Sequence, residues 1–183
     1  MEPITIAILA GTTRAQRHSY KVAQFIAEFG RRRADVEIIL VDPTDFDFPG
    51  DGNDPEGKDR RYSEITARAD AFFIVTPEYN HSFPSSLKRI IDSELDNYNR
   101  KPVAFAGVSS GSWGGVRAVE ALVPVVREIG LVTLSWDVYF PRVQDMFEAA
   151  DELKAEHVER YERNLNKLYD ELVLFARLLK QIR

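Results

Sequence analysis

Three short polar segments of this chain contain residue types suited to binding an anion and a planar ring. They span residues 11–14, 77–80 and 109–115. Each follows directly after a β-branched or apolar run that is typical of a buried strand. In a parallel α/β sheet, the loops that leave the carboxyl ends of the strands share one edge, and ligands bind where the strand order reverses. The three segments are therefore predicted to form one composite site.

The first segment begins at Gly11 and continues into a predicted helix. Hydroxyl groups, backbone N–H groups and a helix N-terminus together suit a phosphate dianion. Arg14 and Arg17 can add charge-assisted hydrogen bonds. The segment lacks the Lys-Ser/Thr ending of a P-loop and the G-x-G-x-x-G dinucleotide fingerprint. In the alternative interpretation, the arginines are solvated and the hydroxyl residues only cap the helix. These hydroxyl residues are Thr12, Thr13 and Ser19.

The second segment is Pro77, Glu78, Tyr79 and Asn80. An aromatic ring and an amide at a rigid strand end could hold a planar heterocycle. Alternatively, the proline and asparagine form an ordinary turn and the tyrosine covers the core. His81 follows and is a candidate proton donor, although a solvent-facing or structural histidine is the commoner case.

The third segment includes Ser109, Gly111, Trp113, Gly114 and Gly115. Its three glycines allow the backbone to approach a ligand closely and to donate N–H groups. A plain flexible turn is the alternative. The tryptophan either packs against a ring or guards the site, or it lies at a subunit contact.

Alternating strands and helices must position these segments. The predicted strands are residues 4–10, 36–41, 71–76, 103–108 and 131–136, and the predicted helices are 20–33, 62–68, 84–96, 116–129 and about 148–182. Such alternation predicts an α/β fold with a parallel sheet covered by helices on both faces, because five units are too few for a barrel. A chain of 183 residues is expected to form one domain.

Two parts of the chain have open interpretations. Residues 42–61 contain three prolines and three glycines, which predicts a long irregular loop. It is either a lid or partner contact, or a loop without a role. The last predicted helix has apolar residues alternating four and three apart, so it packs on the sheet or contributes to a dimer contact.

The composition excludes several classes of protein. The absence of cysteine rules out disulfides, thiolate zinc sites and cysteine nucleophiles. A formal net charge of −5 argues against a general nucleic-acid-binding protein. The three histidines have no metal-ligand spacing. No apolar run has the length of a membrane helix, and the amino terminus lacks signal-peptide features, so a cytoplasmic protein is expected.

Taken together, the three segments resemble the NADPH-dependent FMN reductase family of flavodoxin-like proteins, which includes quinone, azo-dye and chromate reductases. The resemblance rests on Gly11-Thr12-Thr13-Arg14 with Arg17, on Pro77-Glu78-Tyr79-Asn80 with Ser82, Pro84, Leu87, Lys88 and Asp92, and on Gly114-Gly115-Val116-Arg117-Ala118. It implies a doubly wound five-stranded sheet in the order 2-1-3-4-5. It also implies FMN as cofactor and NADPH, or NADH, as hydride donor.

The resemblance assigns roles to the segments. Thr12, Arg14, Arg17 and Ser19 would hold the FMN phosphate, and residues 77–80 and 109–115 would surround the isoalloxazine. No acidic or basic side chain is obligatory, because the cofactor performs the hydride chemistry.

The acceptor stays open among a quinone, a free flavin, an azo compound and a metal ion. Ser85 and Arg89-Ile90 depart from the family's pattern, which leaves the subfamily open. A homodimer or homotetramer is expected. The alternatives are a flavodoxin-type electron carrier with protein partners, and an interaction module that has lost its flavin.

Overall fold

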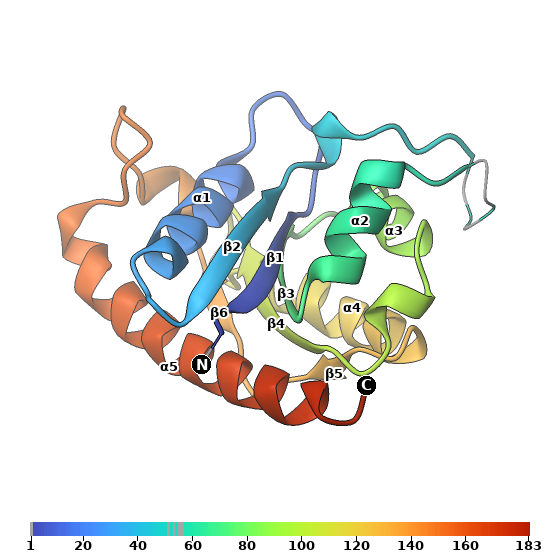
Figure 1. Cartoon of the computed structure of the whole chain (residues 1–183). Coiled ribbons are helices and arrows are strands. Elements are labelled where there is room, and N and C mark those ends of the chain that lie inside the picture. The colour runs from blue at the N-terminus through green and yellow to red at the C-terminus, as the bar shows by residue number, and fades with distance from the viewer. Residues whose placement is uncertain (1, 51, 53, 55–56) are drawn as a thin grey trace.

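Within residues 2–50, 52, 54 and 57–183, which the computed structural model describes, six parallel strands form one sheet between two layers of helices (Figure 1). The strands are β1 (Ile4–Ala10), β2 (Val36–Val41), β3 (Ala71–Pro77), β4 (Pro102–Val108), β5 (Val132–Thr133) and β6 (Val138–Phe140). The helices are α1 (His18–Arg31), α2 (Arg60–Arg68), α3 (Ser85–Asp92), α4 (Val116–Glu128) and α5 (Ala155–Lys180). Short 3₁₀ turns lie at Pro43–Asp45, Asp96–Tyr98 and Val143–Asp145.

The order of the strands confirms the predicted topology. The sheet runs β2-β1-β3-β4-β5, and every pair of neighbours is parallel. The chain moves outward from β1 to β2, then crosses to the other side of β1 to place β3. The order therefore reverses between β1 and β3, and this is where the fold provides a ligand crevice at the carboxyl ends of the strands.

The fifth strand is not the continuous strand over residues 131–136 that the sequence predicts. β5 pairs with the start of β4, and β6 pairs with its end from Ala106 to Val108. Leu134 still donates its N–H to the carbonyl of Val103 at 3.2 Å, and residues 135–137 then leave the ladder. There the indole of Trp136 donates a hydrogen bond of 2.8 Å to Glu171 of α5, and Tyr139 donates one of 2.9 Å to Asp137. The predicted order of five strands is confirmed, and the sheet has one strand more than predicted because the fifth strand is interrupted.

Two apolar cores lie on opposite faces of the sheet because alternate strand residues point to opposite sides. α1 and α5 cover one face, where Ile6, Ile8 and Phe73 are fully buried. α2, α3 and α4 cover the other, where Phe72 and Ile74 are fully buried. Strands buried on both faces explain the continuous apolar runs in the sequence.

Two helices are shorter than predicted. α5 begins at Ala155 instead of near residue 148, because residues 147–153 fold back on themselves. In that turn the N–H of Glu148 donates to the carbonyl of Glu152 at 2.8 Å, and Asp151 has a left-handed φ of 64°. α3 ends at Asp92 instead of residue 96, and Glu94 turns into the protein interior.

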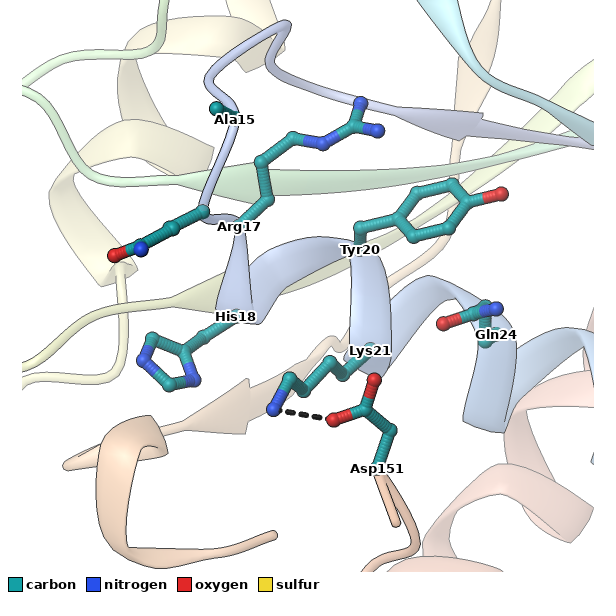
Figure 2. A pocket seen from close by; sticks show the side chains of 8 residues that line it. Ala15, Arg17, His18, Tyr20, Lys21, Gln24 and Asp151 are labelled. Atoms are coloured by element: carbon teal, nitrogen blue, oxygen red, sulfur yellow. Dashed lines mark ion pairs between the residues drawn. The ribbon is translucent and has the colours of Figure 1, made fainter. Parts of the chain in front are cut away.

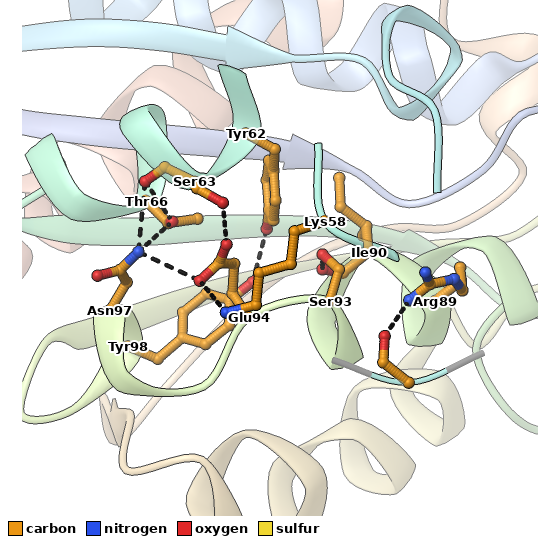
Figure 3. A network of polar contacts seen from close by, with 11 residues as sticks. Lys58, Tyr62, Ser63, Thr66, Arg89, Ile90, Ser93, Glu94, Asn97 and Tyr98 are labelled. Atoms are coloured by element: carbon orange, nitrogen blue, oxygen red, sulfur yellow. Dashed lines mark hydrogen bonds and ion pairs between the residues drawn. The ribbon is translucent and has the colours of Figure 1, made fainter. Parts of the chain in front are cut away.

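Glu94 belongs to a polar network that joins α2 to the end of α3 (Figure 3). Its carboxylate accepts hydrogen bonds from Ser63 and, at 3.2 Å, from Asn97. Beside it, the hydroxyls of Tyr62 and Tyr98 are 2.6 Å apart and buried. Because buried polar groups stabilise a fold only when they are paired, this network specifies how the two helices meet.

Arg89 of α3 holds the loop that precedes α2 (Figure 3). Its guanidinium donates hydrogen bonds to the carbonyls of Phe48, Pro49, Gly52 and Gly57, at 2.6 to 3.2 Å. The irregular loop predicted over residues 42–61 is shorter in the structure, because residues 43–45 form a 3₁₀ turn and α2 begins at Arg60. Residues 51, 53, 55 and 56 lie outside the described part of the chain. Arg89, where the sequence departs from the pattern of the family that it resembles, thus holds this loop against α3.

Candidate functional site

A cavity of about 190 Å³ lies at the carboxyl ends of β1, β3 and β4. All three polar segments contribute to its walls. The lining residues are Thr12, Arg14, Gln16, Arg17, His18, Ser19, Pro77, Glu78, Tyr79, Val108, Ser109, Ser110 and Val143. The three segments that the sequence predicts to form one site therefore line one cavity, at the point where the strand order reverses.

Close packing fixes the start of the first segment. The N–H of Gly11 donates to the carbonyl of Val75 at 2.8 Å, and a Cβ at Gly11 would lie only 2.7 Å from that carbonyl oxygen. A larger residue would push β1 and β3 apart. α1 then begins at His18 with no acidic residue in its first turn and no side-chain cap from Arg17. The N-terminus of this helix thus keeps its positive dipole end for an anion.

Arg17 lines the cavity, but its guanidinium is engaged by protein groups. It donates two hydrogen bonds of 2.7 Å to the carboxylate of Asp42 and one of 2.9 Å to the carbonyl of Thr12. The hydrogen bond to Asp42 raises the pKa of Arg17. Burial raises the pKa of the Asp42 carboxyl, but hydrogen bonds from Arg17 and Thr44 outweigh it and hold that pKa below its ordinary value. Asp42, a residue that the sequence analysis did not single out, thereby fixes the first segment to the end of β2.

Tyr79 connects the first and second segments. Its hydroxyl lies 2.9 Å from the hydroxyl of Thr12, which is buried. Arg14 is exposed, and its guanidinium carbon lies 5.6 Å from the centre of the Tyr79 ring. Arg14 forms no ion pair within the described residues. It is the cation of this cavity whose charge is available for an anion.

Asn80 and His81 form the tip of a tight turn. Tyr79 and Ser82 exchange backbone hydrogen bonds of 2.8 and 2.9 Å across it, and both tip residues have left-handed φ values, 49° and 65°. Both are exposed and neither lines the cavity. The structure therefore places the candidate proton donor His81 on the surface beside the cavity. Thr13, also exposed, is likewise outside the lining.

Glycines in the third segment serve packing. Gly114 and Gly115 are buried, with φ values of 65° and 89°. A Cβ at Gly115 would lie 2.4 Å from the backbone nitrogen of Val108, so only glycine allows α4 to start this close to β4. Gly111 and Trp113 are exposed and, like the two buried glycines, do not line the cavity. From this segment, Ser109 and Ser110 form the cavity wall.

Four further residues reach the cavity although they are outside the set that the sequence indicates. They are Gln16, His18, Val108 and Val143. Gln16 and His18 are the neighbours of Arg17 in the sequence, so their position is a signal that could have identified them as candidate site residues. Val143 comes from the 3₁₀ turn after β6, and no local motif marks it.

A second cavity, of about 370 Å³, lies beside the first on the outer side of α1 (Figure 2). The two share Gln16, Arg17 and His18. Lys21 and Asp151 face each other across it in an ion pair of 2.5 Å. Arg17 points away from that pair, which agrees with its bonds to Asp42.

No helix in the described ranges has the length and apolar character needed to cross a membrane. In the same part of the chain, no three potential metal ligands gather in one place.

Comparison with known proteins identifies relatives over most of the sheet and its loops. The model of the family described as NADPH-dependent FMN reductase matches residues 4–145, which include all three polar segments. A quinone reductase of Pseudomonas putida is 30% identical over 128 residues, which are 64% of this chain and 67% of that protein. An NAD(P)H-dependent FMN reductase of Schizosaccharomyces pombe is 32% identical over 120 residues, 60% of this chain and 59% of that protein.

Solved structures share the fold. The flavoenzyme NAD(P)H:(acceptor) oxidoreductase FerB from Paracoccus denitrificans superposes with a TM-score of 0.76 at 23% identity, covering 95% of this chain and 97% of its own. A flavodoxin from Pseudomonas aeruginosa superposes less well, with a TM-score of 0.60 at 15% identity, 95% of this chain and 99% of its own.

Proposed function

Because this chain belongs to the NADPH-dependent FMN reductase family, we propose that it binds FMN in the cavity at the ends of β1, β3 and β4 and catalyses NAD(P)H oxidation. The acceptor is a small oxidised molecule, with a quinone as the first candidate because a quinone reductase is among its relatives. FMN, when bound, accepts a hydride from the nicotinamide and delivers the electrons to the acceptor.

One observation carries this proposal: three loops of different chemistry form one cavity where the strand order reverses. The first segment and the start of α1 form one wall of the cavity, the first wall. The set of hydrogen-bond donors on this wall fits a phosphate. It combines the uncapped start of α1, the hydroxyls of Thr12 and Ser19, and the guanidinium of Arg14. Helix N-termini and charge-assisted donors are the groups with which proteins bind phosphate dianions.

The residues of the first wall divide into ligands and supports. Arg14 supplies the charge that neutralises the phosphate. Arg17 holds Thr12 in place through its carbonyl while its own charge is balanced by Asp42. This division refines the expectation that both arginines hold the phosphate.

The part of the cavity wall formed by the second and third segments, the second wall, suits a flat ring. Pro77 ends β3 and Glu78 and Tyr79 follow it, while Ser109 and Ser110 follow β4, so the two loops leave adjacent parallel strands side by side. Rigid strand ends hold such loops more precisely than long connections do. His81 is not required as an acid here, because it does not line the cavity.

The protein is also proposed to form a homodimer or a larger homo-oligomer. Leu174 and Leu178, four residues apart on α5, and Ile182, two residues beyond its end, are each more than half exposed. Sedimentation analysis of the purified chain tests this point.

Reconstitution tests the proposed function. The chain is incubated with FMN, freed of unbound flavin, and its flavin content is measured. Retention of about one FMN per chain and steady NADPH oxidation with a soluble benzoquinone are expected. Retained FMN without NADPH oxidation would instead indicate an electron carrier, and no retained FMN would refute the proposal.

A further inference from the structure

Glu78 and Arg117 form an ion pair that joins the second segment to the start of α4, directly after the third segment. One guanidinium nitrogen of Arg117 lies 2.5 Å from Oε1 of Glu78. The Glu78 side chain is only 8% exposed and lines the cavity, whereas that of Arg117 is 42% exposed. The backbone N–H of Glu78 also donates to the carbonyl of Val108 at 2.9 Å, so this residue is anchored at both ends.

The position of Arg117 is unfavourable for α4 itself. It is the second residue of that helix, whose first turn contains no acidic residue. A cation near a helix N-terminus opposes the helix dipole and destabilises the helix. Arg117 therefore does not serve helix stability, and its contact with Glu78 accounts for its presence.

The pair is also incompletely satisfied. Oε2 of Glu78 and Nε of Arg117 are buried, and neither has a hydrogen-bond partner among the described residues. One contact thus balances a carboxylate that is nine-tenths buried. Removing one member of a buried ion pair leaves the other charge uncompensated, which costs more than the pair contributes.

Arg117 also contacts the third segment directly. Its guanidinium carbon lies 5.9 Å from the ring centre of Trp113, which is 66% exposed. A cation at this distance attracts the face of an indole. Arg117 thereby links Glu78, the exposed tryptophan and the start of α4.

We propose that Arg117 is a positioning residue for the ring side of the cavity. By holding the carboxylate of Glu78, it fixes the loops after β3 and β4 against each other. It also neutralises the Glu78 carboxylate in the wall of the cavity that would hold the flavin. The inference rests on the proposed function for the identity of the ligand.

The test compares Arg117→Gln, Glu78→Gln and the double variant, with Arg127→Gln as the matched control. Arg127 is an exposed arginine in the last turn of the same helix. In Arg117→Gln, the affinity for reduced FMN relative to oxidised FMN falls about tenfold, because the unpaired Glu78 carboxylate repels the added negative charge. In the double variant, the ratio of the two affinities returns most of the way to the wild-type value, and in Arg127→Gln it is unchanged. An unchanged ratio in Arg117→Gln, or no recovery in the double variant, would overturn the proposal.

Urea unfolding of the flavin-free chain separates this inference from the proposed function. The two single substitutions must be strongly non-additive in the free energy of unfolding if the pair acts as a unit. If the wild-type chain retains no FMN, the proposed function fails, while additive effects would independently refute the pairing. If Arg117→Gln does not fold, Arg117→Lys replaces it, because lysine keeps the charge but changes the donor geometry. This variant is expected to keep the wild-type ratio of affinities for reduced and oxidised FMN, with a smaller non-additive free energy between positions 117 and 78.

Discussion

Arg17 and Asp42 are joined by two hydrogen bonds of 2.7 Å that tie the loop after β1 to the end of β2. The pair is largely buried, with the side chains 14% and 9% exposed. It makes Arg17 a supporting residue in the cavity wall, and it leaves Arg14 as the available cation. The roles proposed for Arg14 and Arg17 in the first loop follow from this difference in their partners.

Replacing Arg17 is expected to destabilise the fold. Arg17→Met leaves the Asp42 carboxylate without its main partner, at a cost of about 3 kcal/mol. The double variant Arg17→Met/Asp42→Asn should recover part of that loss, because it removes the unpaired charge. Urea unfolding of the three chains measures both effects, and equal stability of the two variants would contradict the account.

The same pair predicts a dependence of stability on pH. The pKa of Asp42 is below its ordinary value in the folded chain. The pair therefore stabilises the fold fully at pH values above the ordinary carboxyl pKa, and this contribution is lost as the pH falls through the lowered pKa. Between about pH 7 and about pH 3, Asp42→Asn should lose less stability than the wild-type chain. Parallel losses in thermal unfolding experiments would contradict this expectation.

Arg14 should discriminate between FMN and riboflavin, which lacks the phosphate. Arg14→Gln removes a charge-assisted hydrogen bond worth about 1.5–3 kcal/mol, so FMN affinity should fall at least about tenfold. Riboflavin affinity should stay within about twofold, since a surface substitution away from the ring changes little. Fluorescence titration measures both constants, with Arg127→Gln as the control. Equal losses for the two flavins would show that Arg14 does not contact the phosphate.

Gly115 and Gly111 allow a matched comparison within one loop. Gly115→Ala places a Cβ against the backbone of Val108 at a φ of 89°, whereas a Cβ at Gly111 meets no atom within 4 Å. We expect Gly115→Ala to destabilise the chain by about 3 kcal/mol or more and Gly111→Ala by less than about 0.5 kcal/mol. Thermal unfolding of both variants checks this, and similar stabilities would argue against the close approach of α4 and β4.

Arg89 should protect the loop between β2 and α2 from proteolysis. Arg89→Met removes four hydrogen bonds to backbone carbonyls while keeping an aliphatic side chain. Cleavage within residues 46–57 should become faster, because local opening of this loop requires less free energy. Lys88→Met, on the same helix, serves as the control. Its ammonium pairs with Asp92, and no hydrogen bond or ion pair joins it to the described residues of this loop. Unchanged cleavage in Arg89→Met would refute the role.

Much of the fold could be predicted because its strands are buried on both faces. The runs that became β1, β3 and β4 are almost entirely apolar, and the run that became β2 is apolar except for Glu37. Gly11, Pro43 and Gly111 follow β1, β2 and β4 within a few residues. The interrupted fifth strand could not be predicted, because Trp136 continues the apolar pattern but leaves the ladder to reach Glu171 on a distant helix.

The sequence indicated which loops form the candidate site but not which side chains pair with one another. Thr12, Glu78 and Ser109 lie in the cavity as their strand-end positions indicated. The engagement of Arg17 by Asp42 and of Glu78 by Arg117 depends on contacts across 25 and 39 residues of chain, and no local pattern reveals them. Position within a loop therefore indicated which residues gather, while side-chain pairing decided which charges remain available.

Anaerobic mixing of the FMN-loaded chain with NADPH tests the central claim most directly. The account predicts that the visible absorbance of the bound flavin bleaches rapidly and recovers when a quinone is added. Bound flavin that stays oxidised in excess NADPH would contradict a reductase.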